Sequence, residues 1–103
     1  MLYLVTTDHF GGPPPPPDQM GGLFDTVAAS MEMLSGLLAS GKIVAGGVPA
    51  GQKRHVFIVE AESNDEVIEL LHGLPLWIIH QWEVTPLESW DHHLEFVRSL
   101  KTG

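Results

Sequence analysis

Six histidines are the residues of this sequence best suited to chemistry near neutral pH. An imidazole can hold or release a proton in that range, as general acid–base catalysis requires. His9, His55 and His80 stand near the ends of segments that we expect to be strands. Asp8 directly precedes the first of them, and a carboxylate beside a histidine suits the same chemistry. The candidate catalytic residues are therefore His80, His9, Asp8 and His55.

Aromatic side chains near the same strand ends are candidate walls for a small-molecule site. Trp77 and Trp82 flank His80, and Phe10 follows the first expected strand. Tyr3 lies on that strand and completes the candidate substrate-binding set. The alternative is that the two tryptophans are core or interface residues, which buried aromatic side chains often are.

Other interpretations of the histidines stay open. Histidines at strand ends can simply be partly exposed, and His92 and His93 on the last expected helix fit a surface role. His72 lies near a helix end, where an imidazole interacts favourably with the terminal carbonyls. Three gathered histidines could bind zinc or copper, but their spacing is no metal motif. We therefore assign neither a metal site nor any other cofactor.

The hydrophobic pattern predicts an α+β fold with the order βαββαβ and a C-terminal helix. The strands are expected at residues 2–7, 42–48, 54–61 and 77–85. The helices are expected from Met20 to a stop at Gly41, over residues 66–74 and over residues 90–101.

Polar residues and a proline mark the ends of these elements. We expect Asp18 and Ser89 to cap the first and last helices, and Ser63 with Glu66 to form a capping box before the second. Pro86 is expected to end the fourth strand, because proline cannot donate to a ladder.

This element order predicts a ferredoxin-like sheet with strand order 4-1-3-2 and two helices on one face. Antiparallel pairing brings the end of the first strand to the starts of the third and fourth. His9, His55 and His80 should therefore gather at one end of the sheet. The prolines of residues 13–17 leave from that end, either as a rigid wall over a pocket, as a stiff spacer, or as a ligand for a proline-recognising domain.

Both faces of the predicted sheet are apolar. Leu2 and Leu4 alternate with Tyr3 and Val5 on the first strand, and the third strand shows the same pattern. The two helices cover one face only, so a second copy of the chain is expected to cover the other. The alternative is that the C-terminal helix covers it alone. We expect a homodimer or a larger homo-oligomer.

The bulk composition narrows the class of protein. The chain has 103 residues, which suits one domain over residues 1–103, and it has no cysteine. Five basic residues face thirteen acidic ones, which argues against binding to nucleic acid or to an anionic membrane. We see neither a signal peptide nor a membrane-spanning apolar run, so we expect a cytoplasmic protein.

The segment SNDEVIELLHGLPLWIIHQWEVTPLE (63–88) resembles the second half of muconolactone isomerases and their dehalogenase relatives. The shared pattern is an acidic helix, the run from Leu74 to Trp77, and a closing strand that ends from Val84 to Leu87. The opening MLYLV is also typical of that family, and SGKIVAGG (40–47) is similar to the YCII-like proteins. Both groups belong to the dimeric α+β barrels, so the resemblance implies two facing ferredoxin-like sheets.

The resemblance implies a small-molecule pocket, and two departures keep us from transferring the isomerases' catalytic residues. Those enzymes carry polar and basic residues after the first strand and a His-Leu-Trp-Arg segment on the second. This chain has its proline run and Ala45 to Val48 there. We expect a cofactor-free isomerase or lyase for a lactone, a cyclic ketone or a polyketide-like compound. The alternatives are a non-catalytic binding protein for an apolar biosynthetic or catabolic intermediate, and a structural oligomeriser.

Overall fold

The computed structural model describes residues 1–9 and 13–102 of the chain. Its strands are β1 (Leu2–His9), β2 (Ile43–Gly47), β3 (Val56–Glu60) and β4 (His80–Leu87). Its α-helices are α1 (Met20–Ala39), α2 (Asn64–His72) and α3 (Trp90–Thr102), and two short 3-10 helices are η1 (Pro17–Gln19) and η2 (Pro75–Ile78). The α+β class and the element order expected from the sequence are confirmed.

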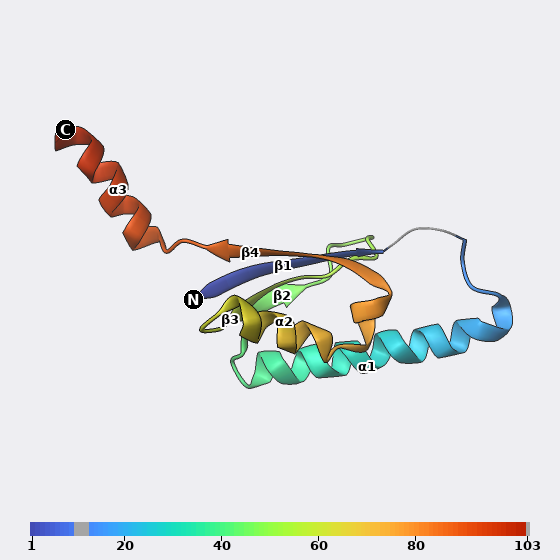
Figure 1. Cartoon of the computed structure of the whole chain (residues 1–103). Coiled ribbons are helices and arrows are strands. Elements are labelled where there is room, and N and C mark those ends of the chain that lie inside the picture. Colours follow the sequence, from blue (N-terminus) through green and yellow to red (C-terminus); the bar gives the residue numbers. More distant parts are fainter. Residues whose placement is uncertain (10–12, 103) are drawn as a thin grey trace.

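The four strands form one antiparallel sheet in the order β2-β3-β1-β4. This is the predicted 4-1-3-2 order. Helices α1 and α2 lie on the same side of the sheet, and α3 extends away from it beyond the end of β4 (Figure 1). The central strand β1 therefore pairs with β4 along its whole length, and with β3 from Leu2 to Thr6.

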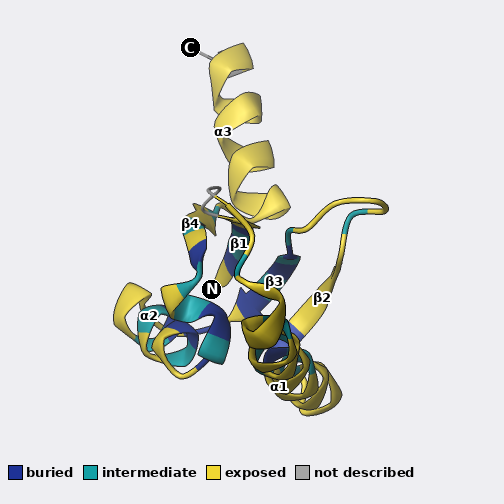
Figure 2. Ribbon diagram, turned by 90° about the vertical axis from the view of Figure 1, so that its right-hand side faces the viewer, coloured by how far each residue is buried: buried dark blue, intermediate teal, exposed yellow. Residues whose placement is uncertain are grey.

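The core lies between the sheet and the first two helices. Tyr3, Val5 and Val59 are buried in one cluster with Val67 and Leu71 of α2. Figure 2 shows buried segments in β1, β3 and α2. Alternate residues of a strand point to opposite faces, so the odd-numbered positions of β1 make up its inner side. Thr7 is the next odd position and is only 1 % exposed.

The predicted helix caps are partly confirmed. The Ser63 hydroxyl accepts a hydrogen bond from the Glu66 amide (3.2 Å), and that of Ser89 accepts one from the His92 amide (3.1 Å). The Glu66 carboxylate accepts from the Glu62 amide and pairs with Lys42, in place of closing the box on Ser63.

The expectation that Asp18 caps the first helix is wrong. Pro17 stands at the start of η1, and this 3-10 turn takes Asp18 into its own first turn. A proline suits the first position of such a turn because it needs no amide donor there. The α-helix therefore begins two residues later, at Met20.

Two details of the fourth strand also differ from the expectation. Pro75 opens η2, so Trp77 lies in a 3-10 turn and the strand begins only at His80. Pro86 does not end the strand, because it pairs opposite Tyr3 and β4 continues to Leu87. β4 is an edge strand, where a missing amide donor can face away from the sheet.

A buried serine fixes η2 against the first helix. The Ser30 side chain is 0 % exposed and its hydroxyl accepts a hydrogen bond from the Leu76 amide (3.0 Å). Leu76 is itself fully buried. This contact holds the turn that leads into His80, and thereby sets where the fourth strand starts.

The second face of the sheet stays uncovered in the single chain. Leu4, Val56 and Ile58 point to that face and are half-buried, while Leu2 is 37 % exposed. α3 points away from this face (Figure 1), so the alternative that the C-terminal helix covers it alone is wrong for the single chain. Within residues 1–9 and 13–102, no helix is long and apolar enough to cross a membrane.

Candidate functional site

Three histidines meet at one end of the sheet, as the topology predicts. His9 pairs directly opposite His80 across β1 and β4, and directly paired residues of antiparallel strands point to the same face. The ring centroids of His9 and His80 are 6.0 Å apart, and those of His55 and His80 are 5.5 Å apart. His55 and His80 are buried and His9 is exposed, so the group runs from the interior to the surface.

Thr7 lies at the centre of this group. Its Oγ1 is 3.2 Å from Nδ1 of His55 and 3.0 Å from Nδ1 of His80. The same oxygen accepts a hydrogen bond from the His55 backbone amide (3.0 Å), and the Thr7 amide donates to the His55 carbonyl (2.9 Å). The Thr7 side chain thus contacts both imidazoles, and the two backbone hydrogen bonds between Thr7 and His55 fix His55 beside β1.

The surroundings keep both buried imidazoles neutral. Burial lowers the pKa of His55 below its usual value, because the charged form loses its hydration. Burial is also the main cause of the lowered pKa of His80, followed by repulsion from His55 and His9, while the negative Asp8 acts in the opposite direction. A neutral imidazole can accept a proton, so both rings are available as bases near pH 7.

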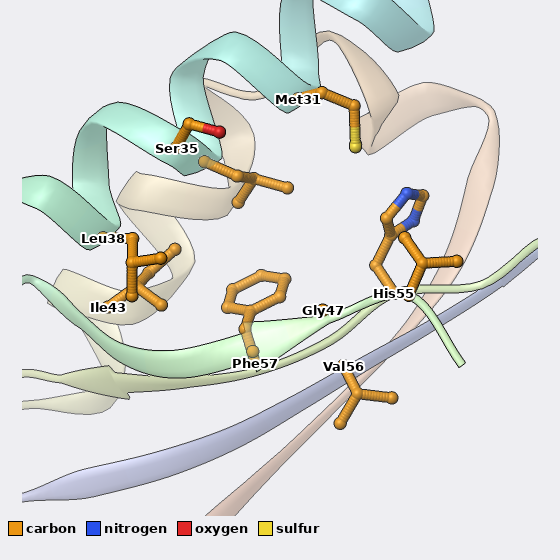
Figure 3. Close-up of a pocket in the computed structure, with 11 residues that line it drawn as sticks. Met31, Ser35, Leu38, Ile43, Gly47, His55, Val56 and Phe57 are labelled. Atoms are coloured by element: carbon orange, nitrogen blue, oxygen red, sulfur yellow. The ribbon is translucent and has the colours of Figure 1, made fainter. Parts of the chain in front are cut away.

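A cavity of about 160 Å³ opens between α1 and the β2–β3 edge of the sheet (Figure 3). Its apolar lining includes Met31, Leu34, Leu38, Ile43, Val48 and Phe57. His55 and Ser35 add polar side chains, and the His55 ring extends from the strand side toward Met31 of the helix (Figure 3). An apolar space with one buried histidine in its wall suits a small, mostly apolar molecule that carries an ionisable hydrogen.

The structure places Asp8 beside the cluster but outside the Thr7 network. Asp8 is exposed and its Oδ1 accepts a hydrogen bond from the His9 backbone amide (2.9 Å). It pairs opposite Gln81, so it points to the other face of the sheet from Thr7 and His9. Its influence on His80 is therefore electrostatic.

The described aromatic candidates lie in two places. Trp77 and Trp82 contact each other (ring centroids 5.5 Å apart), and the Trp82 indole donates to the Trp77 carbonyl (3.2 Å). His72 packs edge-on against Trp77 at 4.5 Å. Trp82 pairs opposite Thr7, which brings this aromatic cluster next to the histidines. Tyr3 is buried in the core near the start of β1, and Phe10 lies outside the described residues.

Thr7 is the site residue that the sequence reasoning missed. The signal was present: in a strand with Tyr3 and Val5 on its inner face, position 7 places a polar group among core residues. The sequence allows the prolines of residues 13–17 to be a pocket wall, a stiff spacer or a ligand for a proline-recognising domain. Among the described residues, those that line the cavity include none of Pro13 to Pro17, and four of these five prolines are exposed.

The expected surface position of two other histidines is confirmed. His92 and His93 are exposed on α3, where each ring lies 2.6 Å from the Glu88 carboxylate. Within residues 1–9 and 13–102, no three His, Asp or Glu side chains are arranged to hold a metal ion.

Comparison with known proteins gives one family and two similar structures. The model of the muconolactone delta-isomerase family matches residues 1–93. A crystal structure of muconolactone isomerase has a TM-score of 0.70 and 21% sequence identity, and the match covers 86% of this chain and 90% of that one.

The second structure is 5-chloro-2-hydroxyhydroquinone dehydrochlorinase from Burkholderia phenoliruptrix AC1100 in complex with 2,5-dihydroxybenzoquinone. It has a TM-score of 0.61 and 25% identity, and the match covers 89% of this chain and 98% of that one. A comparison with curated protein sequences finds no significant match. The α+β fold is thus that of muconolactone isomerase.

Proposed function

The chain belongs to the muconolactone delta-isomerase family, and from that premise we propose that it moves a proton on a small cyclic substrate without a cofactor. The substrate class is an unsaturated lactone, a cyclic ketone or a polyketide-like compound. The reaction is an isomerisation or a related elimination, in which a base removes a proton next to a carbonyl group and an acid returns it elsewhere.

One observation carries this proposal: a buried neutral imidazole stands in the wall of an apolar cavity. His55 lines the cavity, is 8 % exposed, and has its pKa lowered by burial. A group of this kind can remove a weakly acidic hydrogen from a bound molecule, while the apolar walls exclude competing water. His80 and His9 continue from it toward the surface. His80 serves as the second acid–base group, and His9 serves as the contact with solvent.

The two similar structures support the same reaction class. Their names describe an isomerase for a lactone and an enzyme that removes hydrogen chloride from a hydroxyhydroquinone. Both a shift of a double bond and a loss of hydrogen chloride require the removal of a proton. Within this proposal Trp77 and Trp82 form an aromatic wall beside the histidines, and Phe10, outside the described residues, stays a further candidate for substrate contact. Asp8 supports the charge on His80, and Tyr3 belongs to the packing of the core.

The proposal is tested by incubating the protein with muconolactone, related unsaturated lactones and cyclic enones, and following the substrate by NMR. We expect a double-bond shift with at least one member of this panel. Replacing His80 by Ala should abolish that turnover while the circular dichroism spectrum stays unchanged. A wild-type protein that is inactive on the whole panel would argue against the isomerase.

The apolar cavity lining favours a second candidate, a binding protein for an apolar intermediate. Apart from His55 and Ser35, the side chains that line it are apolar. A binding protein would take up the same lactones and enones without changing them. Calorimetry on the panel therefore separates the two, because binding without any conversion supports this alternative.

We propose that the working form is a homodimer in the cytoplasm, or a larger homo-oligomer. The uncovered sheet face supports this, since Leu4, Val56 and Ile58 stay only half-buried in the single chain. α3 adds further exposed apolar side chains, with Trp90 91% exposed and Leu100 66% exposed. Apolar surface of this kind is normally covered by a partner.

A further inference from the structure

The Thr7 hydroxyl has three hydrogen-bonding positions for three neighbours, so the direction of each bond restricts the others. A hydroxyl offers one donor and two acceptor positions. One acceptor position is occupied by the His55 backbone amide. One donor and one acceptor position remain for the two imidazoles, whose Nδ1 atoms lie 3.2 and 3.0 Å away.

Two arrangements satisfy all partners, and in each of them one imidazole donates to Thr7 and the other accepts from it. If both Nδ1 atoms carried hydrogen, they would compete for one lone pair, and if neither did, they would compete for one O–H group. A buried polar group without a partner is costly, so one Nδ1 must donate to Thr7 and the other must accept from it. The two neutral imidazoles are therefore opposite tautomers.

We propose that Thr7 is a relay residue that holds His55 as the Nδ1–H tautomer and His80 as the Nε2–H tautomer, so that His55 presents a bare Nε2 to the cavity. The direction follows from the place of His55 in the cavity wall, because only its Nδ1–H tautomer leaves Nε2 without a hydrogen and able to take a proton there. His55 lines the cavity and its Nδ1 is held by Thr7, which leaves Nε2 for a bound molecule.

The use of this arrangement in catalysis rests on the proposed function. His55 Nε2 takes a proton from a substrate carbon, and the electron pair stays on the substrate as an enolate. The Nδ1 proton of His55 passes to Thr7 Oγ1, and the original hydroxyl proton passes to Nδ1 of His80. His55 is then neutral again, and the positive charge lies on His80, where the nearby Asp8 favours it. The reverse transfer returns a proton to the substrate at its new position.

The consequence is that the positive charge does not remain on the imidazole in the cavity wall, while the enolate stays in the cavity until a proton returns to it. Both imidazoles are buried, but His80 has the negative Asp8 near it and lies beside the exposed His9 at the end of the sheet. Thr7 thus lets His55 return to its neutral form by passing the positive charge to a second buried imidazole. Thr7 does not itself touch the substrate in this scheme and acts through the two histidines.

The test is the tautomer of each histidine in the intact protein without any ligand. Long-range ¹H–¹⁵N NMR spectra, recorded well above the usual histidine pKa of about 6.5, distinguish Nδ1–H from Nε2–H imidazoles. We expect His55 to show the Nδ1–H pattern and His80 the Nε2–H pattern, with signals assigned through the variants His55→Gln and His80→Gln. Identical tautomers at the two positions, or the reversed pair, would overturn the relay as stated.

Two variants separate the relay from simple packing. Thr7→Ser keeps the hydroxyl and should keep the opposite tautomers, whereas Thr7→Val removes it and should abolish the difference. If Thr7→Val does not fold, the wild-type and Thr7→Ser spectra still decide the question. With an active substrate, Thr7→Val should lower kcat on the order of 10²-fold and leave KM nearly unchanged, and Thr7→Ser should restore kcat.

The NMR measurement of the tautomers and the activity measurement test two different claims. Opposite tautomers without turnover of any lactone or enone would contradict the proposed function and leave the hydrogen-bond arrangement standing. Turnover with identical tautomers would contradict the relay alone.

Discussion

At the scale of single residues, the buried imidazoles tie the stability of the fold to pH. The pKa values of His55 and His80 are lowered in the folded state, so the unfolded chain binds more protons as the pH falls. The contribution of these two histidines to the free energy of unfolding is fully present above the pKa of an unfolded histidine, about 6.5, and it is lost as the pH falls below that value. Thr7 contacts both rings through hydrogen bonds, and His9 and Asp8 act on His80 through their charges, of which only that of Asp8 is negative.

We therefore expect a lower melting temperature at pH 5.5 than at pH 7.5. The double variant His55→Gln with His80→Gln should show a smaller decrease over the same interval. The matched control is His92→Gln with His93→Gln, two exposed histidines beside Glu88, which should leave the decrease in place. An equal decrease in wild type and in the buried double variant would show that these imidazoles are not the groups that titrate.

The sequence revealed the types of these residues but not their hydrogen bonds. The gathering of His9, His55 and His80 follows from antiparallel pairing alone, and it is found in the structure. Which face each ring occupies depends on a register that the sequence leaves open by one residue. Thr7 was missed because its role appears only when the register is known and two side chains from neighbouring strands meet on one hydroxyl.

At the scale of elements, the close approach of β2 to β3 explains why position 46 is a glycine, but it does not explain the adjacent Gly47. A Cβ atom on Gly46 would lie 2.5 Å from Cβ of Phe57 and 2.7 Å from the Val56 carbonyl oxygen, whereas one on Gly47 would meet nothing within 4 Å. Both glycines line the cavity. The pair therefore makes a matched test of how tightly these strands must pack.

Gly46→Ala should destabilise the fold by about 1–3 kcal/mol, because the backbone must move to accept the methyl group. Gly47→Ala should change the free energy of unfolding by less than about 0.5 kcal/mol, as expected where a substitution meets no neighbour. Urea denaturation of both variants measures the difference. Equal stabilities would mean that β2 and β3 lie farther apart than the structure has them.

The elements themselves were predicted well where the signals are local. Periodicity and the serine caps located the helices, and the right-handed crossovers gave the order of the strands. The predicted start of β4 was wrong because Pro75 begins a 3-10 turn. The hydroxyl of Ser30, far away in the sequence, holds this turn in place. A contact between residues so far apart in sequence leaves no local signal.

At the scale of the whole molecule, the proposed homodimer should appear as a mass of at least two chains in sedimentation or gel filtration. Ile58→Asp places a charge on the uncovered sheet face and should shift the protein toward the monomer, because a buried unpaired charge is costly. Ala29→Asp, at an exposed position on α1, is the control and should leave the mass unchanged. A monodisperse wild-type monomer at micromolar concentration would contradict the assembly.

The most direct test of the account is the rate at which His55 removes a proton from a bound substrate. In D₂O, NMR measures both the double-bond shift in a lactone and the entry of deuterium at its carbon atoms. We expect His55→Gln to slow both rates by about 10²-fold or more, the usual contribution of a general base, and His93→Gln to leave them unchanged. Equal rates in the folded wild type and His55→Gln variant would contradict the central claim that the cavity histidine is the base.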